Sequence, residues 1–205
     1  MSFYGRRILP WGIDIAMKNR AAAERRTRLL PAARGRVLEI GVGSGHNLAH
    51  YPATVDRVVG LDPSPELLAK ARRRLGAAAV PVELVEHSAE AIPFDDGDFD
   101  TVVSTWTLCS IPDAAAALAE VRRVLKPNGA FLFVEHGRAP SAAVARWQSR
   151  LNPIWSRLSG GCNLDRPIDA LVRAAGFRLA AFECGYLDGG PRLLSYSFMG
   201  KGRPA

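Results

Sequence analysis

The chain has few cysteines, and their spacing matches no common metal site or disulfide framework. The three cysteines are Cys109, Cys162 and Cys184. None lies in a C-x-x-C pair or near a second candidate metal ligand along the sequence. Free cysteines of this kind are usually small buried apolar residues. We therefore expect neither a bound metal nor a set of disulfides.

Long hydrophobic runs are also missing. Apolar runs such as residues 77–82 and 114–119 fall well short of the roughly 18 residues that a membrane-spanning helix needs. Residues 1–30 begin MSFYGRRILP and carry arginines throughout, without the apolar stretch and cleavage site of a secretory signal. The sequence predicts no transmembrane segment and a cytoplasmic location.

Acidic residues are outnumbered, because 27 Lys and Arg against 20 Asp and Glu give a formal net charge of +7. Such an excess favours anionic partners in general. Here the basic residues are dispersed over predicted helices, as at 72–74 and 122–123, and no aromatic and basic RNA-binding motif accompanies them. We expect a small-molecule substrate and no nucleic acid. Nothing in the sequence predicts an oligomeric state.

The 205 residues, 48% of them hydrophobic, suffice for one sizeable core. Short β-branched runs alternate with longer amphipathic ones, which predicts a doubly wound, mostly parallel α/β sheet of seven strands. We interpret residues 1–30 as a helical lid and residues 31–205 as one globular unit. The expected strands are 37–40, 58–62, 82–87, 101–105, 130–136, 177–184 and 194–200.

Helix boundary signals fall between these strands. Ser64 followed by Pro65 and Glu66 predicts a helix that continues to Gly76. Asp113 is a second N-cap candidate, and Pro-Asn-Gly at 127–129 is expected to stop the helix that it begins. Further helices are expected at 141–159 and before Gly176.

The stretch LEIGVGSG, residues 38–45, places a glycine-rich turn directly after the first strand. In a doubly wound sheet, ligands bind where the strand order reverses, and the first strand-to-helix loop is that point. A dinucleotide fingerprint requires glycine three residues after Gly43, where the chain has His46, and no Gly-Lys-Ser/Thr follows. The loop therefore predicts a ligand that lies over bare backbone without a phosphate cradle.

Asp62 ends the second strand, 21 residues after Gly41, where a carboxylate can accept hydrogen bonds from both ribose hydroxyls. This pairing resembles the class I S-adenosylmethionine-dependent methyltransferases. HSAEAIPFDDGDFD at 87–100 resembles the adenine segment of that family, and VRRVLKPNGAFLFVEH at 121–136 resembles its passage into strand five. One position departs from the family pattern, because Ser88 stands where an acid often binds the adenine amino group. That contact would pass to Glu90 or to the backbone.

The resemblance implies an S-adenosylmethionine-dependent methyltransferase that releases S-adenosylhomocysteine and needs no metal. It implies that the glycine loop faces the methionine part of the cofactor and that the segment after strand three flanks the adenine. The cofactor-binding residues that it implies are Glu39, Gly41, Gly43, Gly45, Asn47, Asp62, Pro63, Ser88, Ala89, Glu90 and Thr105.

A narrower resemblance covers residues 36–200. TLCSIPD at 107–113, EHGRAP at 135–140 and WQSRLNPIWSRLSGGCNLDR at 147–166 are similar to the vertebrate endoplasmic-reticulum thiol methyltransferases called methyltransferase-like seven and to their bacterial relatives. The resemblance implies methylation of an alkyl or aryl thiol. The apolar N-terminal anchor of the vertebrate enzymes does not carry over, because this chain is rich in arginine there.

Three questions stay open at this level. His136 ends a strand beside the predicted cleft, where it is either a base that helps ionise a thiol or a structural hydrogen-bonding residue. The basic, aromatic N-terminus, including Phe3, Tyr4 and Trp11, suits either an apolar lid or peripheral contact with an anionic membrane. A phospholipid or quinone methyltransferase is therefore the alternative enzyme. A cofactor-binding partner protein without catalysis is the alternative of another class.

Overall fold

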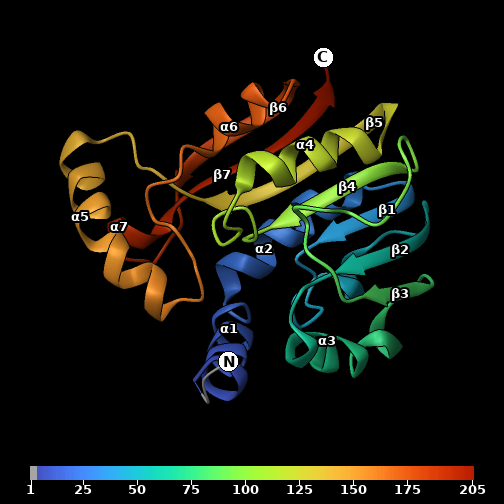
Figure 1. The fold of residues 1–205 in the computed structure, drawn as a ribbon, viewed down its shortest axis with the longest axis horizontal. Coiled ribbons are helices and arrows are strands. Elements are labelled where there is room, and N and C mark those ends of the chain that lie inside the picture. Colours follow the sequence, from blue (N-terminus) through green and yellow to red (C-terminus); the bar gives the residue numbers. More distant parts are fainter. Residues whose placement is uncertain (1–3) are drawn as a thin grey trace.

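The structure, a computed structural model, describes residues 4–205, so Phe3 of the predicted lid lies outside the described residues. Seven strands form one sheet in the order β3-β2-β1-β4-β5-β7-β6, with only β7 antiparallel to its neighbours. This confirms the predicted doubly wound, mostly parallel sheet (Figure 1). The strands are β1 Gly35–Ile40, β2 Val55–Leu61, β3 Val82–Val85, β4 Phe99–Thr105, β5 Leu125–His136, β6 Phe177–Tyr186 and β7 Tyr196–Pro204.

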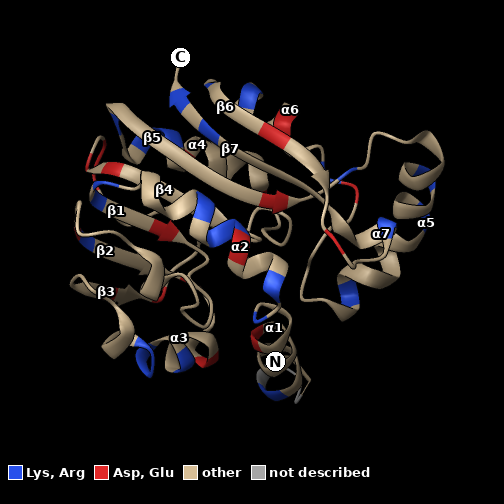
Figure 2. Ribbon diagram, turned by 180° about the vertical axis from the view of Figure 1, so that it is seen from behind, with Lys and Arg blue, Asp and Glu red and all other residues tan. Residues whose placement is uncertain are grey.

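Helices cover both faces of the sheet. In Figure 1, α4 and α6 lie in front of it, whereas α2 lies in front when the molecule is seen from behind in Figure 2. The α-helices are α1 Leu9–Ala16, α2 Arg20–Leu29, α3 Pro65–Arg72, α4 Ala114–Val124, α5 Ala142–Leu158, α6 Ile168–Ala174 and α7 Arg192–Ser195. The short helical turns are η1 Tyr4–Ile8, η2 Leu30–Ala32, η3 Leu48–His50 and η4 Leu75–Ala77.

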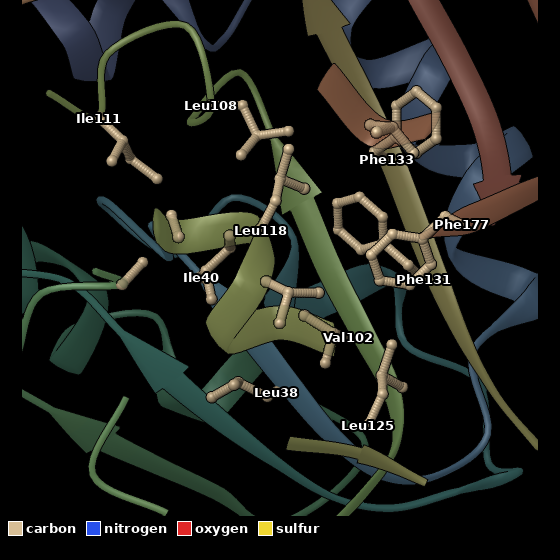
Figure 3. Close-up of a cluster of buried hydrophobic side chains, with 14 of the residues drawn as sticks. Leu38, Ile40, Val102, Leu108, Ile111, Leu118, Leu125, Phe131, Phe133 and Phe177 are labelled. Atoms are coloured by element: carbon tan, nitrogen blue, oxygen red, sulfur yellow. The ribbon is translucent and has the colours of Figure 1, made fainter. Parts of the chain in front are cut away.

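The core is divided into two layers because successive side chains of a strand point to opposite faces. In β1, Leu38 packs with the α4 side chain Leu118 on one face, and Val37 packs with the α3 side chain Leu68 on the other. Figure 3 shows the first layer, in which Phe131 and Phe133 of β5 lie close to Leu118. The central strands are therefore buried on both faces, as their continuous apolar runs predict.

Both predicted N-caps are confirmed. The Ser64 hydroxyl accepts a hydrogen bond from the Leu67 backbone N–H at 3.2 Å. The Asp113 carboxylate accepts from the N–H groups of Ala115 and Ala116 at 3.1 and 2.9 Å. These side chains satisfy backbone donors that the first turn of a helix leaves unpaired.

Four predicted boundaries are wrong. Helix α3 ends at Arg72 and not at Gly76, because Leu75–Ala77 forms a separate short turn. Helix α4 ends at Val124, and the Pro-Asn-Gly stretch lies inside β5, because Leu125 already pairs with Phe99 of β4 across an irregular register. Strand β7 begins at Tyr196 and not at residue 194, because Arg192–Ser195 forms a helical turn. Strand β3 ends at Val85 and lies at the sheet edge, so its side chains are only partly buried.

Basic side chains are spread over several elements in Figure 2 and form no continuous stripe. Within α2, Arg25 and Arg28 form ion pairs with Glu183 of β6, and Arg26 is buried. Within residues 4–205, no helix is long and apolar enough to cross a membrane.

Candidate active site

The glycine loop after β1 leaves open space at one glycine only. Gly41, Gly43 and Gly45 all have positive φ, at 65°, 55° and 79°, a conformation that glycine adopts without strain. A Cβ on Gly41 would collide with the Thr107 side chain, and one on Gly45 would lie 3.1 Å from Ala71. A Cβ on Gly43 would meet only the Gly41 carbonyl oxygen, at 3.8 Å. Gly41 and Gly45 thus serve packing, whereas Gly43 borders free space, as a ligand-facing position requires.

Asp62 is fastened to this loop from the end of β2. One carboxylate oxygen accepts a hydrogen bond from the Gly43 N–H at 2.9 Å, and the other accepts from the Ser64 N–H at 2.9 Å. The side chain is 6% exposed, and burial raises its pKa. Asp62 therefore sets the shape of the loop at Gly43, a role that the sequence did not predict.

Glu39 lies below the loop at the end of β1 and is fully enclosed. Its carboxylate accepts hydrogen bonds from the Asn47 amide at 2.8 Å and from the Tyr51 hydroxyl at 2.7 Å. Asn47 also donates to Thr105 at 3.0 Å and accepts from Arg26 at 2.9 Å. Three predicted site residues, Glu39, Asn47 and Thr105, thus form one buried network under the loop.

Burial raises the pKa of Glu39 to about 7, although the hydrogen bonds from Tyr51 and Asn47 oppose this. Because the folded pKa lies above that of an unfolded chain, the carboxyl group stabilises the fold at low pH. That stabilisation is lost as the pH rises through 7. We expect Glu39→Gln to gain stability relative to the natural chain by about 2–3 kcal/mol between about pH 5 and pH 8. Chemical denaturation of both proteins at each pH measures this difference, and equal pH slopes would contradict it.

The predicted adenine segment forms a compact turn after β3. The Glu90 carboxylate accepts hydrogen bonds from the Ser88 hydroxyl at 2.9 Å and from the Asp113 N–H at 2.7 Å. Ala89 between them is buried, and Pro63 on the neighbouring loop is exposed. Glu90 is thus committed to local contacts through both carboxylate oxygens, and its N–H donates to the Ser88 hydroxyl at 3.2 Å.

The N-terminal helices contact the glycine loop, which sequence reasoning did not find. Asp14 of α1 bonds His46 Nε2 at 2.9 Å and Arg74 at 2.9 Å, and Lys18 lies 3.3 Å away. Burial raises the pKa of Asp14, but a hydrogen bond with Ser44 and the cations Lys18 and Arg74 outweigh this and hold the pKa well below its usual range. A single acid on α1 therefore ties the N-terminal segment to the loop. An isolated Asp in an otherwise apolar helix gave no signal of this in the sequence.

The turn after β4, at the same carboxyl-terminal end of the parallel strands, contains a strained residue. Trp106 has a φ of 51°, a region that bulky residues rarely adopt. Its N–H donates to the Val134 carbonyl at 2.8 Å, and the next N–H, of Thr107, donates to the buried Glu135 carboxylate at 3.0 Å. The turn redirects the chain so that Cys109 is buried beside the end of β5.

His136, the predicted catalytic residue, lies at the carboxyl end of β5 and is 8% exposed. Its Nε2 is 3.3 Å from the Cys162 sulfur, which lies 3.8 Å from the Cys109 sulfur. Burial lowers the pKa of His136, but the contact with Cys162 outweighs this and raises it. The hydrogen bond with Cys109, together with burial, raises the pKa of the Cys162 thiol.

No cysteine lies near a second candidate metal ligand along the sequence, but in the folded chain this expectation is wrong. Cys109, His136 and Cys162 place their ligand atoms within 4.8 Å of one another. The three residues are distant in sequence: Cys109 follows β4, His136 ends β5 and Cys162 follows α5. Only the adjacency of β4 and β5 and the packing of the later loop bring them together.

Residues 38–133 match the family model described as "Methyltransferase domain". Together with the sheet order and the glycine loop with Asp62, this match identifies the chain as a member of the class I S-adenosylmethionine-dependent methyltransferases. A solved structure similar in fold is the N-methyltransferase NodS of Bradyrhizobium japonicum in complex with S-adenosylhomocysteine. Its TM-score is 0.70 at 18% identity, over 96% of this chain and 92% of that one.

Among curated relatives, the chain is 36% identical over 154 residues to the human thiol S-methyltransferase TMT1A, covering 72% of this chain and 62% of the relative. It is 38% identical over 132 residues to the phosphatidylethanolamine N-methyltransferase of Cereibacter sphaeroides, covering 62% and 64%. The chain thus spans less than two thirds of the length of these relatives.

Proposed function

We propose that the chain binds S-adenosylmethionine at the glycine loop and transfers its methyl group to a small thiol. The observation that carries the cofactor proposal is the free space at Gly43, bordered by the Asp62 carboxylate. Gly43 would lie against the methionine part, Asp62 would accept from the ribose, and the backbone at 88–90 would flank the adenine. When bound, the cofactor supplies a methyl group already activated on a sulfonium sulfur.

The protein's own task is then to hold the acceptor and to exclude water. A pocket of about 250 Å³ near the Cys162 loop suits the apolar part of an acceptor. It is lined by Leu151, Ile154, Trp155, Leu158, Leu164, Pro191, Leu193 and Leu194. An unperturbed thiol has a pKa near 8.5, so modest assistance suffices to ionise it near neutral pH. Similarity to TMT1A supports a thiol as acceptor.

We propose that the lid is restricted to the part of residues 1–30 that reaches the glycine loop. Leu29 of α2 belongs to the core, whereas α1 carries Asp14 onto His46 and Arg74. Tyr4 donates a hydrogen bond to the Leu158 carbonyl of α5, and Leu9 packs against Gly160. These contacts support a lid that spans from the cofactor loop to the acceptor pocket.

We propose that His136 assists ionisation of the acceptor thiol. With a simple alkyl thiol, His136→Ala should lower the methylation rate at about pH 7, and much of the loss should return by about pH 9. At that pH, solvent alone supplies thiolate. Initial rates of wild type and variant over this range, corrected for the uncatalysed reaction, measure the effect.

His50→Ala is the matched control, because His50 is a partly exposed histidine at the end of η3 and is not among the predicted cofactor-binding or catalytic residues. It should leave the profile unchanged. A constant ratio of His136→Ala to wild-type rates across the pH range, with a lower melting temperature, would assign His136 a purely structural role.

A phospholipid or quinone acceptor is the second candidate, favoured by an exposed apolar face. Trp147, Leu151, Ile154 and Leu158 of α5 repeat at helical spacing and are all exposed, and Trp11 of α1 is 60% exposed. A methyl-transfer screen with labelled cofactor over thiols, amines, phenols and phospholipids decides between acceptors. Co-sedimentation with anionic vesicles tests membrane contact, and no product with any acceptor would favour a cofactor-binding partner protein.

A further inference from the structure

Two cysteines and one histidine from three separate segments meet beside the candidate active site. Cys109 follows β4, His136 ends β5 and Cys162 lies in the loop after α5. Cys109 and His136 are buried, and Cys162 is partly buried. The chain has only three cysteines in 205 residues, and composition alone does not explain why the sulfur atoms of two of them lie 3.8 Å apart.

Two of the three distances between ligand atoms are close to those of a tetrahedral metal centre, and the third, between Cys109 and His136, is within 4.8 Å. Zinc binds cysteine sulfur at about 2.3 Å, so two sulfur ligands at a tetrahedral angle lie roughly 3.8 Å apart. The two sulfur atoms here are 3.8 Å apart. Sulfur and imidazole nitrogen on the same ion would lie about 3.6 Å apart, and Cys162 Sγ lies 3.3 Å from His136 Nε2.

The loops that carry the thiols are locked to each other by polar contacts. The Cys109 carbonyl accepts from both the backbone N–H and the side-chain amide of Asn163, at 2.8 and 3.0 Å. Arg166 donates to the carbonyls of Leu108 and Ile111, which flank Cys109. The positive φ of Gly161, at 89°, lets the loop turn against Ser110. The two loops that carry the thiols are therefore held against each other, which favours metal affinity.

We propose that Cys109, His136 and Cys162 form a binding site for zinc with an open fourth position. Two thiolates and one imidazole with an open position are a ligand set found in catalytic zinc sites. Thiolate and imidazole ligands also suit zinc better than magnesium or calcium. The proposal departs from the expectation, drawn from cysteine spacing alone, of a chain without a metal.

The location of the site indicates a role for the open fourth coordination position. This role rests on the proposed thiol methylation. Strands β1, β4 and β5 are neighbours about 4.8 Å apart, so the end of β5 lies roughly 10 Å across the sheet from the glycine loop. A thiol that enters the fourth position forms a metal–sulfur bond, displaces the bound water and releases its proton to solvent. The acceptor is then held as a thiolate at neutral pH, so His136 would assist ionisation as a ligand of the ion and not by accepting the proton itself.

Metal binding is tested on the reduced chain by a measurement that does not depend on enzymatic activity. Zinc is removed with a chelator, and cobalt(II) is titrated in while the thiolate-to-cobalt charge-transfer absorption is recorded. We expect one equivalent to bind, and zinc to displace the cobalt. Cys109→Ser and Cys162→Ser should weaken binding at least about hundredfold, because even partners of a metal ligand contribute ten- to hundredfold.

Cys184→Ser is the matched control, since Cys184 is exposed on β6, and it should bind as the natural chain does. Titration of each variant with S-adenosylmethionine checks that the serine variants remain folded. No charge-transfer band in the reduced natural chain, or equal affinity in the serine variants, would overturn the metal site. Loss of two thiols in air without metal uptake would equally overturn it in favour of a disulfide.

Adding an alkyl thiol to the cobalt form separates the two proposals. A changed cobalt spectrum together with methylated product supports both the open position and the thiol acceptor. A cobalt site in a chain that methylates no thiol upholds the metal site and overturns the proposed acceptor. Thiol methylation that survives complete removal of metal upholds the acceptor and overturns the role of the ion.

Discussion

Replacing Asp62 with Ala is expected to weaken binding of S-adenosylmethionine by more than about tenfold. The carboxylate is the predicted acceptor for two ribose hydroxyls, and hydrogen bonds to a charged group contribute roughly 1.5–3 kcal/mol each. The structure adds a second cause, because Asp62 also accepts from the N–H groups of Gly43 and Ser64. Alanine removes the support of the loop together with the ribose contact. Calorimetric titration of the folded variant measures the change in Kd.

Two further variants separate these causes. Asp62→Asn keeps one side-chain oxygen for the backbone but loses the charge, so its affinity should lie between those of Asp62→Ala and the natural chain. Asp56→Ala is the matched control, because Asp56 is an exposed acid on the same strand. A Kd unchanged in Asp62→Ala, with a normal circular dichroism spectrum, would remove Asp62 from the cofactor site.

The sheet was predictable because its signals are local. Continuous apolar runs mark strands buried on both faces, and the capping side chains of Ser64 and Asp113 mark where helices begin. The errors lie where pairing between strands decides the boundary. Strand β5 begins at Leu125, before Pro127, because Leu125 pairs with Phe99 of β4. The sequence near residue 125 does not reveal this pairing.

The cofactor residues were predictable to a similar degree. Glycine spacing and the acid at the end of β2 are sequence patterns with a fixed place in this fold. The roles within the pattern were not: Gly41 avoids the Thr107 side chain and Gly45 avoids Ala71, and these neighbours belong to other segments. The contacts of Asp14 and the cluster of Cys109, His136 and Cys162 join distant segments, so no spacing of residues along the sequence predicts them.

Gly43 is the position where a substitution distinguishes a ligand site from a turn. A side chain on Gly41 would collide with Thr107, so that variant would test packing as much as binding. A Cβ atom on Gly43 would meet only one carbonyl oxygen within 4 Å. Any large effect on affinity beyond the backbone strain must then come from the ligand.

We expect Gly43→Val to abolish measurable binding of S-adenosylmethionine, a loss of at least about a hundredfold, while the chain remains folded. The branched side chain would occupy the space proposed for the methionine part, and a non-glycine residue at positive φ adds about 1–2 kcal/mol of strain. Calorimetric titration and circular dichroism on the same sample measure affinity and fold together.

Gly176→Val separates strain from occupancy. Gly176 has a φ of 81°, and a Cβ at this position would have no neighbour within 4 Å, so valine there carries comparable backbone strain. It precedes β6, which runs in the same direction as β5. Gly176 therefore lies at the amino-terminal end of the parallel strands, opposite the end that carries the glycine loop. Both valine variants should lose similar stability, but only Gly43→Val should lose the cofactor. Normal affinity in Gly43→Val would reduce the glycine loop to a tight turn, and equal losses in both variants would assign the effect to strain.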